Sequence, residues 1–280
     1  MIAVVYSGSK TAIWKIAKGK KTIAECSMPG INPLFVDQKT LLMQLNKKTI
    51  LINHAERLKK IYVFAAGATS VQKRDELAAS LSLFFKFSKI IVQDDLSGAS
   101  IAACGNKSGI VSLLGSGSNC AYYNGNQPEE NNFGLGFILG DEGSANHMGK
   151  MILKHYLQEK LPAELLKKFK KKYDLNRSEI LERVYKKTLA QQFLSSFLDF
   201  YIENSEHEYI RQLVDKAFQG FVDTYLLPAM KLNPGKEIHF VGLVAGTFQE
   251  RLHVVAQNNG FEINTITKEP IYNLLNYYSN

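Results

Sequence analysis

The chain has 280 residues and a formal net charge of +8, with 45% hydrophobic and 21% charged residues. At about 150 residues per domain this length suggests two domains, and the composition excludes an intrinsically disordered chain. The N-terminus MIAVVYSGSK lacks the pattern of a signal peptide, and no stretch approaches the ~20 apolar residues of a membrane span. We therefore expect a cytoplasmic protein with no membrane partner.

The cysteines and lysines argue against two further classes of protein. Cys26, Cys104 and Cys120 are widely spaced and odd in number, which disfavours a disulfide framework or a zinc cluster. Five lysines lie in the segment 167–172, and such a run is found in nucleic-acid patches as well as on solvated helix faces. Since no nucleic-acid motif surrounds the run, we expect a solvated helix face and no nucleic-acid partner.

The first hundred residues predict a small antiparallel meander that extends into a mixed sheet. Turn-forming residues separate three strand-like runs at Ile2–Tyr6, Ala12–Ile16 and Thr22–Cys26. Two further strands are expected at 61–65 and 90–93, and Ser70 can cap a helix between them. Strands that alternate with a helix indicate an α/β fold with crossover connections.

The same order of elements then begins again. A strand at 110–114, the turn GSGS and a strand at 120–123 precede a helix that we expect to start at Asp141. Later strands are expected at 238–241 and 261–266, with a helix between them. This internal duplication predicts two similar sheets.

Residues from about 158 to 230 have a wholly helical pattern. Apolar residues recur at helical spacing from Ile210 to Tyr225, and Pro228 is expected near the end of that helix. We interpret the block as a helical insertion in the second domain.

Two turns rich in glycine and serine are candidate phosphate loops: Ser7-Gly8-Ser9-Lys10-Thr11 and Gly115-Ser116-Gly117-Ser118-Asn119. Glycine allows backbone N–H groups to approach a phosphate closely, and hydroxyl groups add donors. Neither turn matches the P-loop pattern, and each joins two strands, so an ordinary hairpin is the alternative for either one alone. Two such turns, one at the start of each domain, favour a paired phosphate clamp.

Two acidic pairs are candidate ligand or catalytic groups. Asp94-Asp95 follows an apolar strand directly, at the strand end where ligands collect in open α/β sheets; a helix cap is the alternative there. Asp141-Glu142 lies among closely spaced glycines, which indicate tight turns, and an N-cap at Asp141 is compatible with a ligand role. A strand also runs into a helix across Gly242 and Gly246, where nucleotides often bind and where close helix packing is the alternative.

Taken in order, these segments resemble the N-acetylglucosamine kinase branch of the actin, sugar kinase and Hsp70 ATPase superfamily. That branch is grouped with the Bad/Bcr-type ATPases. The resemblance spans nearly the whole chain, and GSGSNC and GDEGSA are its specific segments. The matching segments are YSGSKT, GINP, QDDLSGASIAA, GIVSLLGSGSNCAYYNG, LGFILGDEGSANHMGK, HFVGLVAGTF and EPIYNLLNYY.

The resemblance implies an α/β fold with two ribonuclease H-like (actin-like ATPase) domains. The domains are expected at 1–104 and 105–280, with the helical insertion of the second at about 158–230. The last helix, at about 269–279, is expected to pack back on the N-terminal lobe. The oligomeric state stays open, with a homodimer as one option.

The resemblance also implies an ATP- and Mg²⁺-dependent kinase whose acceptor is an amino sugar, N-acetylglucosamine or a related hexose. Asp95 falls on the position of the general base that takes the proton from the sugar hydroxyl. Asn32, Asn119 and Asp141 fall on positions expected near the sugar. The residues implied in ATP binding are Ser7, Gly8, Ser9, Lys10, Thr11, Gly115, Ser116, Gly117 and Ser118 for the phosphates, and Gly242, Ala245 and Gly246 for the adenosine.

Tyr6 departs from the family pattern, in which the first loop starts with an aspartate that organises the hydrated Mg²⁺. Hard cations prefer oxygen ligands of the carboxylate kind, so the metal ligands stay unassigned, with Asp94 and Asp141 as candidates to compensate. The alternative prediction is a catalytically degenerate protein that binds sugar or nucleotide. A third hypothesis, an ATPase activator with an iron–sulfur cluster, is disfavoured because the three cysteines lack a cluster context.

Overall fold

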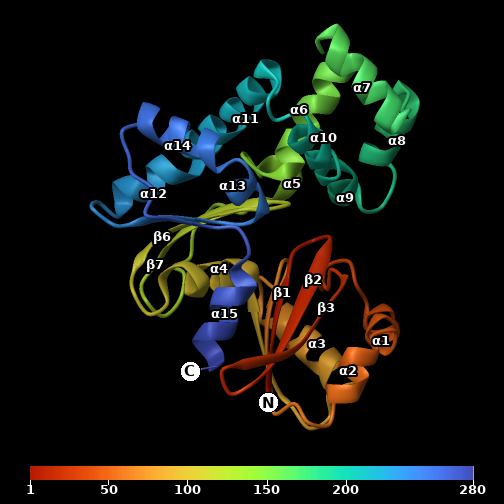
Figure 1. Cartoon of the computed structure of the whole chain (residues 1–280), viewed down its shortest axis with the longest axis vertical. Helices are drawn as coiled ribbons and strands as arrows, with labels where there is room; N and C mark the ends of the chain where they lie inside the picture. Colours follow the sequence, from red (N-terminus) through yellow and green to blue (C-terminus); the bar gives the residue numbers. More distant parts are fainter. Residues whose placement is uncertain (280) are drawn as a thin grey trace. The chain divides into compact units, whose positions relative to one another are not determined.

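The computed structural model describes residues 1–279, which form two compact units (Figure 1). Unit 1 comprises Met1–Val111, Ala121–Glu130 and the residues from Glu269 onward. Unit 2 comprises Ser112–Cys120 and Asn131–Lys268. No helix within residues 1–279 is long and apolar enough to cross a membrane.

Unit 1 contains a mixed five-stranded sheet in the order β3-β2-β1-β4-β5. The first three strands pair antiparallel, whereas β4 pairs parallel with both β1 and β5. The predicted meander and its extension into a mixed sheet are therefore confirmed. The strands are β1 (Ile2–Ser7), β2 (Thr11–Lys18), β3 (Lys21–Pro29), β4 (Lys60–Ala65) and β5 (Lys89–Asp94).

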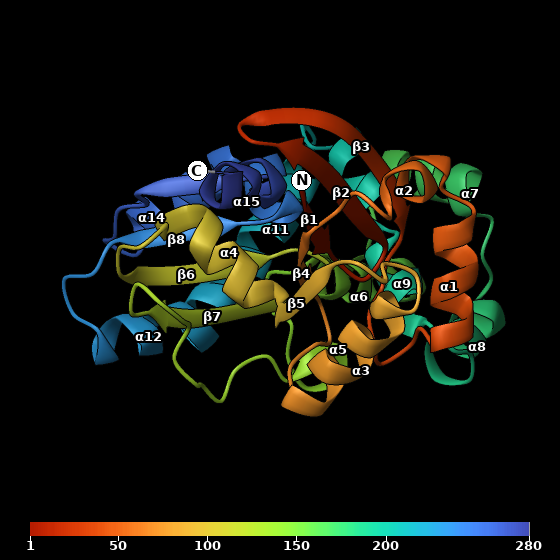
Figure 2. The same ribbon diagram turned by 90° about the horizontal axis from the view of Figure 1, so that it is seen from below.

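Helices cover both faces of this sheet. Successive strand residues point to opposite faces, so Ala3 and Val5 of β1 pack with leucines of α1, α2 and α3 in one core. On the other face Tyr62 of β4 stacks on Tyr278 of α15, with ring centroids 3.8 Å apart. Figures 1 and 2 show α15 beside α4 on that face. The helices of unit 1 are α1 (Gln38–Asn46), α2 (Thr49–His54), α3 (Val71–Ser82), α4 (Asp95–Cys104) and α15 (Pro270–Ser279).

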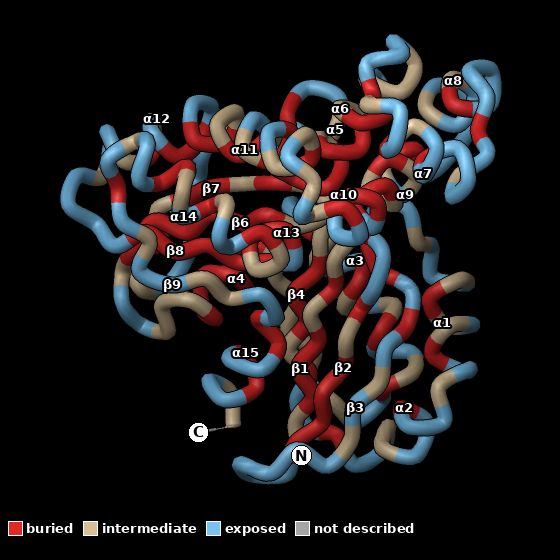
Figure 3. Tube along the Cα trace, turned by 45° about the horizontal axis from the view of Figure 1, so that its top comes forward, coloured by how far each residue is buried: buried red, intermediate tan, exposed pale blue. Residues whose placement is uncertain are grey.

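The centre of unit 1 is the pair of strands β1 and β4. Figure 3 shows both as largely buried, in contrast to the exposed outer side of α1.

The predicted cap of α3 is also confirmed, because the Ser70 hydroxyl accepts from Lys73 N at 3.2 Å.

The second sheet has four strands in the order β7-β6-β8-β9. Its order matches the order β2-β1-β4-β5 of the first sheet, which confirms the internal duplication. We expected the last strand at 261–266, but it is shorter and lies further along. The Asn264 side chain accepts from Ile238 N at 2.8 Å. This side chain takes the place of a main-chain acceptor where the pairing between the strand at 238–241 and the last strand would begin. The strands are β6 (Gly109–Leu114), β7 (Ser118–Tyr123), β8 (Ile238–Val241) and β9 (Thr265–Thr267).

Apart from its share of this sheet, unit 2 is helical. The five lysines of the segment 167–172 are exposed on α7, while Leu165 and Phe169 of the same helix are buried, so the run is a solvated helix face. The helices are α5 (Gly136–Leu139), α6 (Ala145–Leu157), α7 (Ala163–Tyr173), α8 (Arg177–Tyr185), α9 (Ala190–Ser195), α10 (Leu198–Glu203), α11 (Glu208–Phe221), η1 (Val222–Leu226), α12 (Leu227–Leu232), α13 (Leu243–Thr247) and α14 (Gln249–Asn258).

The apolar stripe of α11 is buried as its spacing predicts, but Pro228 does not end the helix. The chain passes from α11 through the π-helical turn η1 into α12, of which Pro228 is the second residue. Proline lacks the N–H that a regular α-helix would need at this point. The wider π turn just before it lets the helical path continue.

Candidate functional site

The turn between β1 and β2 is the first candidate phosphate loop. Gly8 N donates to Thr11 O at 3.1 Å, which closes the turn. Ser7 is fully buried, and its hydroxyl accepts from Ile31 N at 3.0 Å and donates to Gly8 O at 3.1 Å. The Ser7 hydroxyl therefore anchors the loop that follows β3, and phosphate binding by Ser7–Thr11 stays a prediction.

Asn32 lies in that anchored loop. A Cβ at Gly30 would lie 2.6 Å from Gly8 O, so the loop and the turn touch through their backbones. Asn32 is buried, and its Oδ1 accepts from Leu34 N at 2.9 Å. A Cβ at Gly67 would lie 2.0 Å from the same oxygen, so glycine is needed there to make room for the amide. The Asn32 side chain is thus held in one place by its surroundings.

Asp94 and Asp95 stand at the end of β5 as predicted, and the structure separates their roles. Asp94 is the N-cap of α4, with its Oδ1 accepting from Ser97 N at 2.7 Å. Asp95 is then the first residue of α4, where the helix dipole stabilises negative charge. A Cβ at Gly98 would lie 2.7 Å from the Phe64 ring, so α4 packs directly on β4. The helix cap is therefore confirmed for Asp94, and a catalytic role of Asp95 stays a prediction.

Tyr6 of β1 contacts the start of this helix. Its hydroxyl donates to the main-chain oxygen of Asp95 at 3.3 Å. Burial, followed by the nearby charges of Asp95 and Asp94, raises the pKa of Tyr6 well above its ordinary value. The side chain is therefore a neutral phenol at neutral pH, and it supplies none of the negative charge that a carboxylate would bring.

The turn between β6 and β7 is the second candidate phosphate loop. The first amides of α6 bind it: Ala145 N donates to Gly115 O and Asn146 N donates to Ser116 O, both at 3.0 Å. In a trans peptide the N–H points opposite to the preceding C=O. The amides of Ser116 and Gly117 therefore point away from α6, which is the arrangement that an anion-binding turn requires.

Asp141 connects this turn to α6. It is only 3% exposed, and its carboxylate accepts from Ser118 N and from Asn146 Nδ2, each at 3.1 Å. Burial raises the pKa of Asp141 above its ordinary value, while the bonds from Asn146 and Ser118 oppose that shift. A Cβ at Gly117 would lie 2.9 Å from the carboxylate, so glycine lets the turn approach it.

The expected helix start at Asp141 is wrong. Helix α6 begins at Ala145, and its N-cap is Ser144, whose hydroxyl accepts from His147 N at 3.2 Å. Asp141 instead has a positive φ of 66° and turns its carboxylate to Ser118. The long-range bond to the turn thus replaces the local cap.

Two buried oxygens beside Asp141 have no hydrogen-bond partner among the described residues. They are Ser118 Oγ and Asn146 Oδ1, on residues that are 5% and 0% exposed. An unpartnered buried polar atom is costly, so the cluster suits a polar ligand or a bound water.

Asn119 adjoins the same cluster. Its Oδ1 accepts from Cys120 N at 2.8 Å, and a Cβ at Gly134 would lie 2.8 Å from its Nδ2. Gly134 has a φ of +69°, which also favours glycine. Asn119 thus follows Ser118, whose N–H donates to Asp141, and sugar binding by Asn119 and Asp141 stays a prediction.

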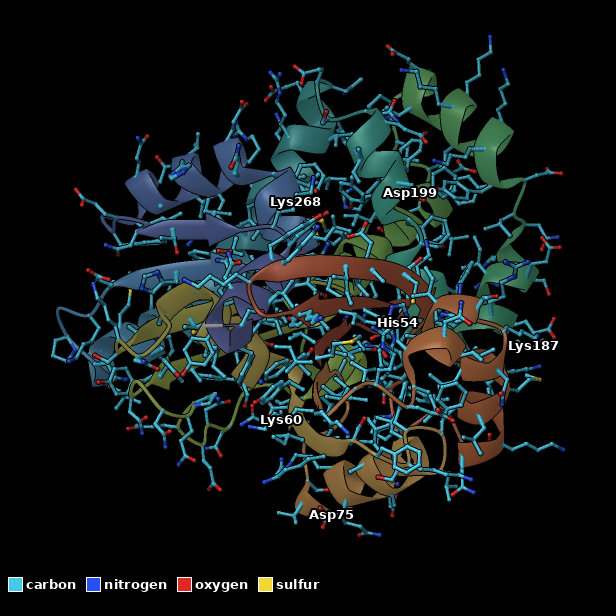
Figure 4. All side chains as sticks on the ribbon, turned by 60° about the horizontal axis from the view of Figure 1, so that its bottom comes forward. His54, Lys60, Asp75, Lys187, Asp199 and Lys268 are labelled. Atoms are coloured by element: carbon cyan, nitrogen blue, oxygen red, sulfur yellow. The ribbon has the colours of Figure 1, made fainter. Side chains whose placement is uncertain are left out.

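The glycines predicted to lie against the adenosine are needed for packing inside unit 2. Gly242 has a φ of +117°, and a Cβ there would lie 2.4 Å from Leu114 O. A Cβ at Gly246 would lie 2.4 Å from Lys268 Cβ, and Figure 4 labels that lysine. Packing alone therefore explains why glycine occurs at positions 242 and 246. Adenosine binding at Gly242, Ala245 and Gly246 stays a prediction.

No group of three or more His, Cys, Asp or Glu side chains that could hold a metal ion occurs within residues 1–279. Mg²⁺ usually keeps several waters and binds one or two carboxylates together with substrate phosphates. The adjacent Asp94 and Asp95 fit that chemistry.

Tyr225 of η1 is a residue that sequence reasoning missed. Its hydroxyl accepts from Asp141 N at 3.0 Å and donates to Glu142 Oε2 at 2.5 Å. The two partners are 84 and 83 residues away in the chain, and no local pattern marks such a contact. The helical spacing of α11 predicted only that Tyr225 is buried.

Solved structures with this fold include sugar kinases. A Porphyromonas gingivalis protein provisionally named an N-acetylglucosamine kinase shares 30% identity at a TM-score of 0.92, over 100% of this chain and 99% of that chain. A Chromobacterium violaceum protein with the same provisional name shares 14% identity at 0.71, over 99% and 98% of the two chains. A ROK family glucokinase from Streptomyces griseus, in complex with glucose and AMPPNP, shares 9% identity at 0.59, over 99% and 97%.

The second and third of these similarities show the fold alone. A scan against protein-family models gives no match, and a search of curated proteins gives none either.

Proposed function

Because the chain belongs to the sugar-kinase-like family with the actin-like ATPase fold, we propose that it phosphorylates an amino sugar, N-acetylglucosamine or a related hexose, with ATP. The observation that carries the proposal is the 30% identity, over the whole chain, to a protein provisionally named for that activity. The AMPPNP in the glucokinase complex supports a nucleoside triphosphate as donor. Membership of the Bad/Bcr branch and a cytoplasmic location stay predictions, and the oligomeric state stays open.

In the proposed reaction Asp95 takes the proton of the acceptor hydroxyl. The hydroxyl oxygen then forms a bond to the γ-phosphorus, the bond from that phosphorus to the bridging oxygen breaks, and ADP leaves. Little covalent chemistry is asked of the protein, so most of the rate comes from positioning and charge stabilisation. Mg²⁺, when bound, would neutralise charge on the phosphates, and Asp94 is the carboxylate proposed to hold it, which leaves Asp95 as the base.

The remaining residues of the proposal bind and orient. Asn119, Asp141 and Asn32 are assigned to the sugar. The amides of Ser116 and Gly117 and the turn Ser7–Thr11 are assigned to the phosphates, and Gly242–Gly246 to the adenosine. Support for the sugar assignment comes from the polar cluster of Asp141, Ser118 and Asn146, in which two oxygens have no hydrogen-bond partner among the described residues.

A coupled ADP-release screen with Mg²⁺ and ATP tests the proposal. The acceptors are N-acetylglucosamine, its epimer N-acetylmannosamine, glucosamine and glucose, with the sugar-free reaction as control. We expect sugar-dependent ADP release that is largest with an N-acetylated hexosamine. Equal ADP release with and without every sugar overturns the kinase proposal.

The neutral Tyr6 favours a second candidate, a protein that binds sugar or nucleotide without transferring phosphate. Titration calorimetry with each sugar, and with ATP and Mg²⁺, separates the two candidates. Heat of binding without ADP release supports the second candidate, whereas turnover in the screen rejects it.

A further inference from the structure

The π-helical turn η1 places one phenol against the segment that leads to Asp141. Tyr225 is 1% exposed, and its hydroxyl accepts from Asp141 N and donates to the Glu142 carboxylate. The phenol donates its one hydrogen to Glu142, and its oxygen accepts the N–H of Asp141. One buried oxygen therefore fixes the main chain of Asp141 and the side chain of the next residue. Such π turns are frequent at functional sites.

Asp141 needs this support because of its backbone conformation. Its φ of +66° lies in the left-handed region, which few residues other than glycine adopt. Conformations of this kind persist only where the surroundings determine them strongly. The bond from Asp141 N to Tyr225 acts on the main chain, and the bonds from Ser118 and Asn146 act on the carboxylate.

The Tyr225 ring also holds the beginning of the same segment. Phe133 packs against it edge to face, with ring centroids 5.2 Å apart and an interplanar angle of 86°. The next residue, Gly134, is the one that lies against the Asn119 amide. At the other end, a Cβ at Gly140 would lie 2.7 Å from the Tyr225 oxygen. Both ends of the segment 133–141 therefore contact this one side chain.

We propose that Tyr225 is a positioning residue that sets the affinity for the sugar by fixing the main chain at Asp141. The inference rests on the proposed function, in which Asp141 and Asn119 bind the sugar. Tyr225 bonds to Asp141 and Glu142 and packs against Phe133, so its proposed effect on the sugar is transmitted by these residues.

The first test compares Tyr225→Phe with the parent chain. Phenylalanine keeps the ring contact with Phe133 and removes the hydroxyl. Both of its hydrogen bonds are lost, and we expect the KM for the sugar to rise about tenfold because the main chain of Asp141 is no longer fixed by one of them. We expect the KM for ATP to stay within about twofold, because the variant changes the sugar side of the site. Hydrogen exchange of the amides at 135–144 should become faster.

Tyr201→Phe is the matched control. Tyr201 is fully buried in the same unit, and its hydroxyl donates to Met148 O at 2.9 Å. The variant loses a buried phenol bond of the same kind without touching the segment 133–141. We expect some loss of thermal stability, an unchanged KM for the sugar and unchanged exchange at 135–144.

A double-variant cycle with Gly140→Ala sharpens the test. The new methyl group would meet the Tyr225 oxygen, so the single variant should raise the KM for the sugar. Gly140 has a φ of −156° and a ψ of −134°, so alanine adds backbone strain in either background. With Tyr225→Phe the oxygen is gone, so Gly140→Ala should raise the KM for the sugar by a smaller factor in that background than in the parent chain. Additive effects of the two changes contradict the contact.

The outcomes separate the inference from the proposed function. A parent chain that turns over sugar, with an unchanged sugar KM in Tyr225→Phe, overturns the inference and leaves the function standing. A parent chain without sugar-dependent turnover overturns the function. The exchange measurement then decides the inference, because it needs no turnover: unchanged exchange at 135–144 in Tyr225→Phe rejects the positioning role.

Discussion

The two duplicated turns differ in the group that stands beside them. In unit 2 the β6–β7 turn is bound by a buried carboxylate, since Asp141 accepts from Ser118 N at 3.1 Å. In unit 1 the β1–β2 turn is held by the Ser7 hydroxyl, and the residue before it, Tyr6, is a neutral phenol. The same topology therefore carries two electrostatic environments. The two sheets thus share the order of their strands, whereas the charge beside each turn depends on a single residue.

The largest effect is expected at Asp95, the carboxylate of unit 1. Asp95→Asn keeps the size of the side chain and removes the proton acceptor, so kcat should fall by about 10²- to 10⁴-fold. The readout is sugar-dependent ADP release, with thermal unfolding to show that the fold is intact. Asp75→Asn is the control, because Asp75 is an exposed carboxylate on α3 (Figure 4). Unchanged turnover in Asp95→Asn removes the assigned base.

Asp141→Asn tests the carboxylate of unit 2 and should separate binding from stability. A folded pKa above the unfolded value means that the stabilising contribution is present at low pH and is lost as pH rises through the folded pKa. At pH 7 the buried charge is therefore unfavourable, and the neutral amide should unfold at an equal or higher temperature. Asparagine also tolerates the positive φ.

The same variant should weaken sugar binding. We expect the KM for the sugar to rise at least tenfold, because a charge-assisted hydrogen bond to a hydroxyl is lost. Kinetics and thermal unfolding at pH 7 provide the two readouts. A lower unfolding temperature together with an unchanged KM would show that Asp141 acts only as a structural carboxylate.

Tyr6→Asp makes the first turn more like the second. It places a third carboxylate beside Asp94 and Asp95, so the metal-free protein should lose stability through like-charge repulsion. Mg²⁺ should relieve that repulsion and raise the unfolding temperature by about 2–4 °C, which corresponds to ~1 kcal/mol. Tyr6→Phe loses the bond to Asp95 O without adding charge, and it should show no such Mg²⁺ effect. Equal Mg²⁺ effects in the two variants argue against a metal site there.

The smallest effect concerns pH. Burial lowers the pKa of His147, His155 and His239, all of which lie in unit 2. As pH falls through about 6.5, the unfolded chain takes up protons that the folded histidines do not, so unit 2 loses stability. His147 Nδ1 accepts from Gly143 N at 3.0 Å, and His147→Gln keeps an acceptor that does not titrate. Unfolding between pH 7.5 and 5.5 should have a smaller pH slope in that variant, by less than ~1.4 kcal/mol per pH unit.

The sequence predicted what local patterns encode. The strand positions other than the last, the Ser70 cap and the place of Asp94 and Asp95 at the end of β5 follow from periodicity and turn chemistry, and the structure confirms them. The start of α6 could not be predicted, because aspartate and serine cap helices equally well and GDEGS contains both. A bond between residues 23 apart, from Ser118 to Asp141, decided between them.

The contacts of Tyr225 were beyond prediction for a related reason. Hydrophobic spacing reports that a residue is buried, and it does not report which main-chain group its hydroxyl will meet. The path of the helix past Pro228 was also missed, since a π turn has no periodicity of its own in the sequence.

Helix α15 follows all of unit 2 in the chain, yet it completes unit 1. Its Tyr272 ring covers the Lys15 ammonium of β2 at 4.0 Å, and its Tyr278 stacks on Tyr62 of β4. During translation, that side of the first sheet therefore has α4 but lacks α15 until every residue of unit 2 has left the ribosome. We expect the nascent chain to depend on chaperones through that interval, and a fragment that ends before residue 269 to aggregate.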